Sequence, residues 1–174
     1  GVLDIGCNNG HFSTIAARNG ARVVAIDSDP VLVGDVWRWA RSEGLDILPL
    51  VIDITRPSPA IGWRNQECPL FLARAQGAFD AVLMLAVIHH LLVTERIPLP
   101  EIIDLAAELT SNILIIEFID PADSMFRRMV RGRGYLFTGL TLEYFETICR
   151  RRFEIVRSQH IDETRRYLYL LRKK

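Results

Sequence analysis

The residues best suited to chemistry lie in a short segment at the start of the 174-residue sequence. Asp4, Gly6 and Gly10 form the pattern D-x-G-x-x-x-G directly after the apolar stretch Val2 to Ile5. Gly6 permits a sharp turn, and Gly10 permits a ligand to approach the backbone closely. A helix that starts there presents unpaired N–H groups to an anionic group such as a carboxylate. The segment therefore predicts a ligand-binding turn between a strand and a helix.

The glycine spacing distinguishes a dinucleotide, which binds through its pyrophosphate, from a ligand that binds through a carboxylate. A dinucleotide fingerprint, G-x-G-x-x-G counted from Gly6, requires glycine at the positions that Asn8 and His11 occupy. The pattern fails, so a nicotinamide oxidoreductase is disfavoured. It remains the alternative from a different class of protein, and NADH binding would revive it.

Acidic residues lie at the carboxyl ends of the next two predicted strands. Asp27 ends the stretch Arg22 to Asp27, at a spacing from the glycine loop close to that of the ribose-binding acid in nucleotide folds. Asp53 ends the stretch Ile47 to Ile54. Ligands of open α/β sheets bind at the carboxyl ends of the strands, so these acids and the glycine loop are expected at one edge.

Apolar runs alternate with helical patterns along the chain, which is typical of a parallel sheet covered on both faces. A short polar turn, Ile161 to Thr164, forces the last two strands to be antiparallel. We therefore predict an α/β fold with a Rossmann-like, doubly wound, mostly parallel sheet of seven strands and a C-terminal antiparallel hairpin. The predicted strands are 2–5, 22–27, 47–54, 81–88, 112–119, 153–160 and 166–171, and the predicted helices are 10–19, 30–44, 68–75, 99–109, 122–130 and 141–151.

The loop, the acids and the hairpin together resemble the class I S-adenosylmethionine-dependent methyltransferases of the small-molecule type, over nearly the whole chain. The D-x-G-x-x-x-G pattern resembles their motif I, and Phe79 to Leu91 resembles motif IV. The resemblance implies S-adenosylmethionine as cofactor, with the loop on its methionine end, Asp27 on the ribose, Asp53 and Ile54 on the adenine, and the methyl group near Leu85. The cofactor-binding residues that it implies are Asp4, Gly6, Cys7, Asn8, Gly10, Asp27, Ser28, Asp53, Ile54, Leu85 and Ala86.

Two histidines follow the predicted fourth strand. His89 or His90 is a candidate catalytic base, since an imidazole with a pKa near ~6.5 suits proton removal from a hydroxyl or an amine. Glu117, near the end of the fifth strand, is a second candidate to face the pocket. The Asn/Asp-Pro-Pro-aromatic run of nucleic-acid amino methyltransferases is absent. We therefore expect methyl transfer to an oxygen or nitrogen of a small molecule, with an RNA or protein methyltransferase, or a non-catalytic cofactor-binding relative, as alternatives.

Composition limits the partners. Lys plus Arg equals Asp plus Glu at 21 each, so a nucleic-acid partner is unlikely. No cysteine or histidine spacing fits a metal, and no apolar run reaches the ~20 residues of a membrane span. Four arginines between Arg127 and Arg133 would suit an acidic or phosphorylated acceptor, with a solvated helix face as the alternative. We expect a single cytoplasmic catalytic domain, residues 1–174, from which upstream N-terminal helices have been removed; the sequence leaves the oligomeric state open.

Overall fold

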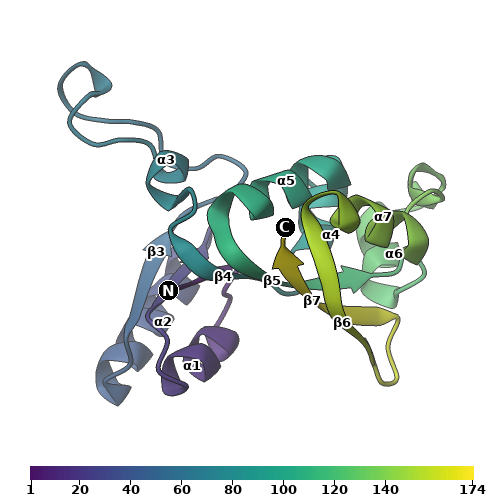
Figure 1. The fold of residues 1–174 in the computed structure, drawn as a ribbon, viewed down its shortest axis with the longest axis horizontal. Helices are drawn as coiled ribbons and strands as arrows, with labels where there is room; N and C mark the ends of the chain where they lie inside the picture. Colours follow the sequence, from purple (N-terminus) through teal and green to yellow (C-terminus); the bar gives the residue numbers. More distant parts are fainter. The chain divides into compact units, whose positions relative to one another are not determined.

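The computed structural model describes residues 1–174, and they fall into two compact units. The first unit comprises residues 1–83 and 109–111, and the second comprises residues 84–108 and 112–174. The strands form a seven-stranded sheet in the order β3-β2-β1-β4-β5-β7-β6, and Figure 1 labels β3, β4, β5, β6 and β7. This order confirms the predicted Rossmann-like mixed sheet with an antiparallel hairpin at its C-terminal end.

The first unit is built on parallel strands. Strand β1 (Val2–Ile5) pairs with both β2 (Val23–Asp27) and β4 (Phe79–Met84), and β2 also pairs with β3 (Ile47–Val51). β3 lies at the edge of the strand order, as Pro49 predicts, because a proline lacks the N–H that a central strand needs.

Helices α1 (His11–Arg18) and α2 (Pro30–Glu43) follow the first two strands. An aspartate before Pro30 and a glycine at position 44 predict the two ends of α2. The Asp29 carboxylate caps α2 by accepting the N–H groups of Val31 and Leu32, and Gly44 ends the helix in the left-handed conformation. The spacing of Trp37 with Leu32, Val36 and Ala40 predicts a place in the buried stripe of α2, but this prediction is wrong, since Trp37 is 51% exposed. Its neighbour Val36 takes the buried position, and one residue further along turns the side chain by about 100°.

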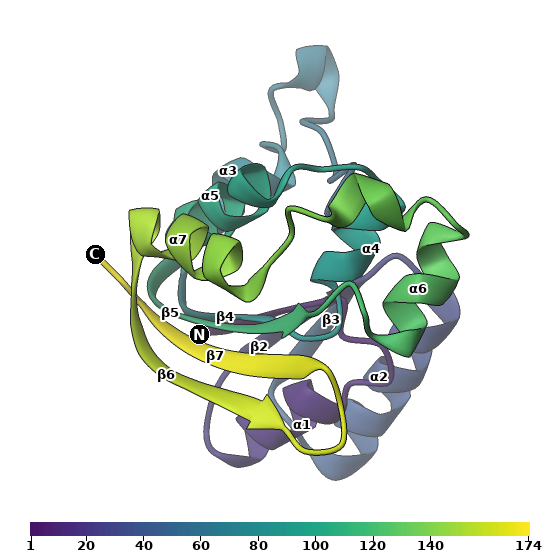
Figure 2. The same cartoon turned by 90° about the vertical axis from the view of Figure 1, so that its right-hand side faces the viewer.

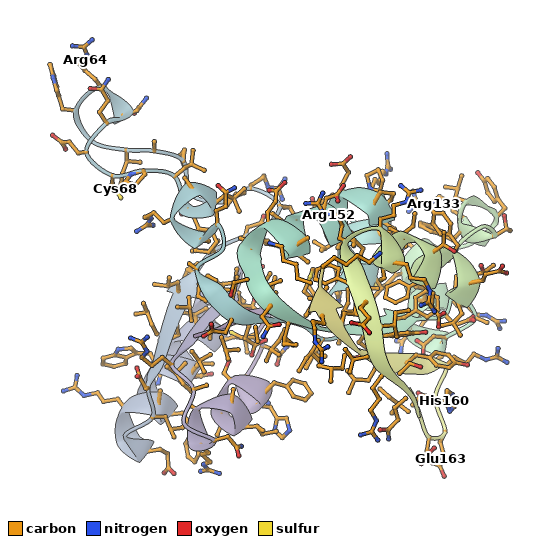
Figure 3. All side chains as sticks on the ribbon, viewed as in Figure 1. Arg64, Cys68, Arg133, Arg152, His160 and Glu163 are labelled. Atoms are coloured by element: carbon orange, nitrogen blue, oxygen red, sulfur yellow. The ribbon has the colours of Figure 1, made fainter.

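An arm extends from the first unit between β3 and α3 (Phe71–Ala75), and Figure 1 shows it reaching away from the strands. A backbone bridge between Ile61 and Cys68 joins the two sides of the arm, and the short helix η1 (Trp63–Asn65) forms its tip. Figure 3 shows Arg64 at the tip and Cys68 nearer the base. The predicted helix 68–75 starts three residues late, because Pro69 disfavours helical geometry in the residue before it.

The second unit carries the antiparallel strands and the remaining helices. Strand β7 (Arg166–Lys173) pairs with β5 (Thr110–Ile119) on one side and with β6 (Phe153–Ile161) on the other. Figure 2 shows β6 and β7 side by side as a hairpin, with helix α7 on one face of these strands. The helical elements are α4 (Ile88–Val93), α5 (Leu99–Leu109), α6 (Ser124–Val130), η2 (Gly134–Phe137) and α7 (Leu142–Arg152).

Two predicted strand ends are wrong, and both affect candidate site residues. The strand predicted over 81–88 spans 79–84 and is followed by helix α4, so His89 and His90 lie on a helix. An apolar run in the sequence does not distinguish a buried strand from a buried helix, and Ala86 breaks the extended chain with a φ of 51°. Similarly, β3 ends at Val51, and Asp53 lies in the segment that follows it.

The interior of each unit is apolar. Leu3 and Ala25 are completely buried in the first unit, and Ile116 and Phe145 are completely buried in the second. All three cysteines are free thiols. None of the helices combines the length and the apolar character that crossing a membrane requires.

Candidate functional site

The loop between β1 and α1 is folded tightly. Gly6, Asn8 and Gly10 all have positive φ angles, of 73°, 49° and 76°. The N–H groups of Gly6 and Cys7 both donate to the carbonyl oxygen of Ile26, at 2.9 and 3.0 Å. These bonds bring the loop, as predicted, to the carboxyl end of β2.

Asp27 joins this loop to the start of α2. Its Oδ2 atom accepts the N–H of Asn8 at 2.9 Å, and its Oδ1 atom accepts the N–H of Asp29 at 3.0 Å. A carboxylate offers about four acceptor positions, so two remain for a ligand such as a ribose diol. Ser28, the next residue, is exposed beside it.

Asp4 lies beneath the loop, with 2% of its surface exposed. Its Oδ2 atom accepts the Ser13 hydroxyl at 2.6 Å, which ties β1 to the first turn of α1. Burial raises the pKa of Asp4, and the negative charge of Asp27 adds to this effect against the hydrogen bonds from Ser13. Ser13 was not among the residues predicted from the sequence, and its position in the first helical turn after the loop was the available signal.

The electrostatic character of the loop is negative. Neither Asp4 nor Asp27 forms a salt bridge, and the charge of Asp27 already acts against that of Asp4. A positively charged ligand would relieve this repulsion, whereas a pyrophosphate would increase it. The loop therefore fits a cationic ligand better than a dinucleotide.

The Cys7 side chain is buried, so only its backbone is available to a ligand. Its side chain belongs to the apolar cluster of Val23, Val36 and Ala40, and burial, followed by the charges of Asp4 and Asp27, raises its pKa to about 12. The Cys7 side chain is therefore a neutral thiol at physiological pH, which excludes it as a nucleophile.

Gly10 is required by its contact with α2. A Cβ atom at this position would lie 2.9 Å from Cγ2 of Val36, in addition to the strain of the positive φ. The absence of a side chain lets α1 begin close to α2, and no side chain caps α1. The N–H of His11 nevertheless donates to Oδ1 of Asn9 at 3.3 Å, and the Ser13 backbone already bonds Asp4, so only part of the first turn of α1 is open to an anionic group.

Asp53 and Ile54 lie in the turn after β3. The N–H of Ile52 donates to the carbonyl oxygen of Asp27 at 2.9 Å, which brings this turn next to the end of β2. The Asp53 carboxylate accepts the hydroxyl of Thr55 at 2.6 Å and the Arg56 side chain at 3.2 Å. These bonds, that of Thr55 foremost, lower the pKa of Asp53 against the effect of burial. The carboxylate is thus ionised and half-buried, as an acceptor for an amino group should be.

The remaining candidates belong to the second unit. Leu85 is half-buried, Ala86 is exposed, and His90 is exposed on α4. His89 is buried, and its Nδ1 atom has no hydrogen-bond partner. Burial, followed by the charges of His90 and Arg166, lowers the pKa of His89 to about 4. His89 is therefore neutral at physiological pH, and His90 is the histidine that solvent reaches.

Glu117 is buried and binds Ala86 and Arg166. Glu117 was a candidate from the sequence, whereas its partner Arg166, 49 residues away in the chain, was not. The available signal was Glu117 itself, the one charged residue in the otherwise apolar stretch Ile113 to Ile119. No group of three or more histidine, cysteine, aspartate or glutamate side chains is arranged to hold a metal ion.

Comparisons with known proteins point in one direction. A family described as "Methyltransferase domain" matches residues 1–159, which include parts of both units. The nodulation protein NoeA of Rhizobium meliloti is 33% identical over 169 residues, which cover 97% of this chain and 35% of NoeA. A ubiquinone biosynthesis O-methyltransferase of Xanthomonas oryzae is 36% identical over 89 residues, covering 51% of this chain and 31% of that protein.

The fold comparison agrees with these matches. The crystal structure of the N-methyltransferase NodS from Bradyrhizobium japonicum superimposes with a TM-score of 0.64 at 21% identity, covering 99% of this chain and 84% of NodS. This similarity establishes the shared fold. The chain spans about a third of the length of the curated relatives that it matches.

Proposed function

Because this chain belongs to the methyltransferase domain family, and with it to the class I S-adenosylmethionine-dependent methyltransferases, we propose that it transfers a methyl group to an oxygen or nitrogen of a small molecule. We further propose that residues 1–174 act as one catalytic domain. The observation that carries the proposal is the hydrogen bond from the Asn8 N–H to the Asp27 carboxylate, which joins the glycine loop to the acid at the end of β2.

The residues of the first unit suit the parts of S-adenosylmethionine. Asp27 retains acceptor positions for the ribose hydroxyls, and the glycine loop at the start of α1 suits the methionine carboxylate. Asp53 and Ile54 supply an acceptor and an apolar side chain for the adenine. Asp4 holds α1 through Ser13 and adds negative charge that favours a cationic ligand.

The bound cofactor supplies a methyl group that its sulfonium already activates. The protein therefore needs mainly to align the acceptor and exclude water, and positioning alone contributes much of the rate. We propose His90 rather than His89 as the residue that accepts a proton from the acceptor, since the ring of His89 is buried. Leu85 and Ala86 remain our proposed neighbours of the methyl group.

Two observations support the proposed acceptor, one from the relatives and one from the arginines of α6. The relatives include a ubiquinone biosynthesis O-methyltransferase and an N-methyltransferase, so both an oxygen and a nitrogen acceptor have precedent. Arg127 and Arg128 are exposed on α6 and form no salt bridge, which favours an acceptor with a carboxylate.

Calorimetric titration with S-adenosylhomocysteine tests the cofactor site. The wild type should bind, and Asp27→Ala should weaken binding by about tenfold or more, because charge-assisted hydrogen bonds are lost. Asp35→Ala is the matched control, since Asp35 is an exposed aspartate of α2 that pairs with Arg38. Equal binding by the wild type and Asp27→Ala would remove the ribose assignment, and NADH binding would favour an oxidoreductase.

Transfer from S-adenosylmethionine with a tritiated methyl group tests the reaction. Catechol serves as the hydroxyl probe, benzylamine as the amine probe, and 3,4-dihydroxybenzoate as the carboxylated probe. Labelling of one probe class identifies the acceptor atom, and a preference for the carboxylated probe supports the arginine assignment. Cofactor binding without labelling of any of these probes would instead favour a non-catalytic relative.

A further inference from the structure

A series of hydrogen bonds between charged side chains in the second unit ends at the backbone N–H of Ala86. The guanidinium of Arg166 donates from Nη1 to Oε1 of Glu117 at 3.1 Å and from Nε to Oδ2 of Asp123 at 3.2 Å. The other oxygen of Glu117 accepts the N–H of Ala86 at 3.1 Å. A side chain at the start of β7 is thereby connected to the backbone that follows β4.

The contacts are sheltered from water. The side chains of Glu117 and Asp123 are 9% and 8% exposed, and that of Arg166 is 25% exposed. Burial opposes the charge on Arg166, but the hydrogen bonds and charges of Asp123 and Glu117 outweigh it and raise the pKa of Arg166. The guanidinium therefore stays charged and keeps Glu117 oriented, since charge-assisted bonds are the stronger kind.

Register explains how these residues meet. Glu117 lies opposite Leu168 in the antiparallel pair of β5 and β7, and Arg166 lies two residues from Leu168. Diagonal neighbours on one face of a sheet are within reach of long side chains. Asp123 is held independently, because its other oxygen accepts the N–H of Met125 at 2.8 Å as the cap of α6.

Ala86 needs an external partner. Its φ of 51° is a left-handed conformation that costs an L-residue energy, and alanine has no polar side chain to compensate for this cost. Such strained residues persist where the surrounding structure holds them, and they are concentrated at functional sites. The Glu117 carboxylate is the group that holds this one.

We propose that Arg166 and Glu117 are positioning residues that fix the backbone at Ala86 for methyl transfer. The catalytic part of this inference rests on the proposed function, in which Leu85 and Ala86 adjoin the methyl group. The antiparallel hairpin thus acts on the reaction through Arg166 without touching the substrate.

NMR on the full, ¹⁵N-labelled chain without ligand tests the positioning. Arg166→Met should accelerate hydrogen exchange of the Ala86 amide by about tenfold, because Glu117 loses the cation that orients it. Glu117→Gln retains an oxygen acceptor, so it should preserve most of the protection while shifting the amide proton resonance. The control is Arg172→Met, which removes an exposed pair with Glu154 from the same strand and should leave Ala86 unchanged.

Kinetics with the probe that the wild type methylates tests the consequence. Arg166→Met should lower kcat by about tenfold to a hundredfold, since small misplacements at a reacting centre are costly, while the Kd for S-adenosylhomocysteine stays within about twofold. Arg166→Lys should restore part of kcat. If Arg166→Met does not fold, Arg166→Gln removes the same cation while keeping a polar side chain, and its comparison with Arg166→Lys and the wild type takes the same place.

Two results would overturn the inference. One is unchanged Ala86 exchange in a folded Arg166→Met protein, and the other is altered exchange with unaltered kcat. If the wild type methylates no probe, the proposed function is wrong, and so is the catalytic part of this inference. Hydrogen exchange of the Ala86 amide then still tests whether Arg166 and Glu117 fix the backbone.

Discussion

At the residue scale, the buried carboxylate of Asp4 lowers the stability of the folded protein when it is charged. The carboxyl group is buried, and burial raises its pKa above the ordinary value, with Asp27 adding to the effect. The unfolded chain therefore releases this proton at a lower pH than the folded protein does. The contribution of Asp4 to the free energy of unfolding is fully present below the unfolded pKa and is lost as the pH rises through the folded pKa.

We therefore expect Asp4→Asn to stabilise the protein at pH 7 by about 0.5–2 kcal/mol, the gain typical of relieving a constraint kept for function. Ser13 can still donate to the amide oxygen of the new side chain. Urea denaturation at pH 7 and near pH 3 measures the difference, which should shrink at the lower pH, where Asp4 is protonated. Weaker binding of S-adenosylmethionine should accompany the gain. A loss of stability at pH 7 would contradict this account.

At the scale of elements, the packing of α1 against α2 depends on Gly10. Gly10 and Gly44 both have left-handed φ angles, but only a Cβ at Gly10 would meet another side chain. A side chain at Gly44 would therefore cause backbone strain alone, whereas a side chain at Gly10 would cause both backbone strain and steric overlap.

We expect Gly44→Ala to lower the free energy of unfolding by about 1 kcal/mol, through backbone strain alone. Gly10→Ala should cost about 1–3 kcal/mol more, because it also overpacks against Val36. Chemical denaturation measures both, and Gly10→Ala combined with Val36→Ala shows whether removing the overlap offsets part of the loss. Equal costs for the two glycine variants would show that overlap with Val36 plays no part.

For the whole molecule, His89 links folding to pH. Its pKa is lowered to about 4, first by burial and then by His90 and Arg166, while Asp123 acts in the opposite direction. Between pH ~6.5 and ~4 the unfolded chain binds a proton at this position and the folded protein does not. The free energy of unfolding therefore falls as the pH decreases through this range.

We expect His89 to contribute about 3 kcal/mol to that decrease, at about 1.4 kcal/mol per pKa unit. His89→Asn should flatten the dependence of the free energy of unfolding on pH between about 6.5 and 4, as urea denaturation at several pH values will show. His160→Asn is the control, because His160 is exposed near the turn of the β6–β7 hairpin, where Figure 3 labels it. Parallel curves for wild type and His89→Asn would refute the link.

The sequence by itself determined the features that depend on neighbouring residues. The order of strands and helices followed from the spacing of apolar residues, and Asp29, Pro30 and Gly44 marked the ends of α2. The position of Asp27 at the carboxyl end of β2 followed in the same way. These features were predictable because turns, caps and side-chain alternation act over a few residues.

Only the tertiary structure decided which polar groups are buried and what they bind. It placed Ser13 on Asp4, turned Trp37 outward, and showed that the chain after Met84 forms a left-handed turn and a helix. It also brought Arg166 to Glu117. Partners of this kind depend on the register of strands far apart in the sequence and on the exclusion of water around them, and local patterns of residue type record neither.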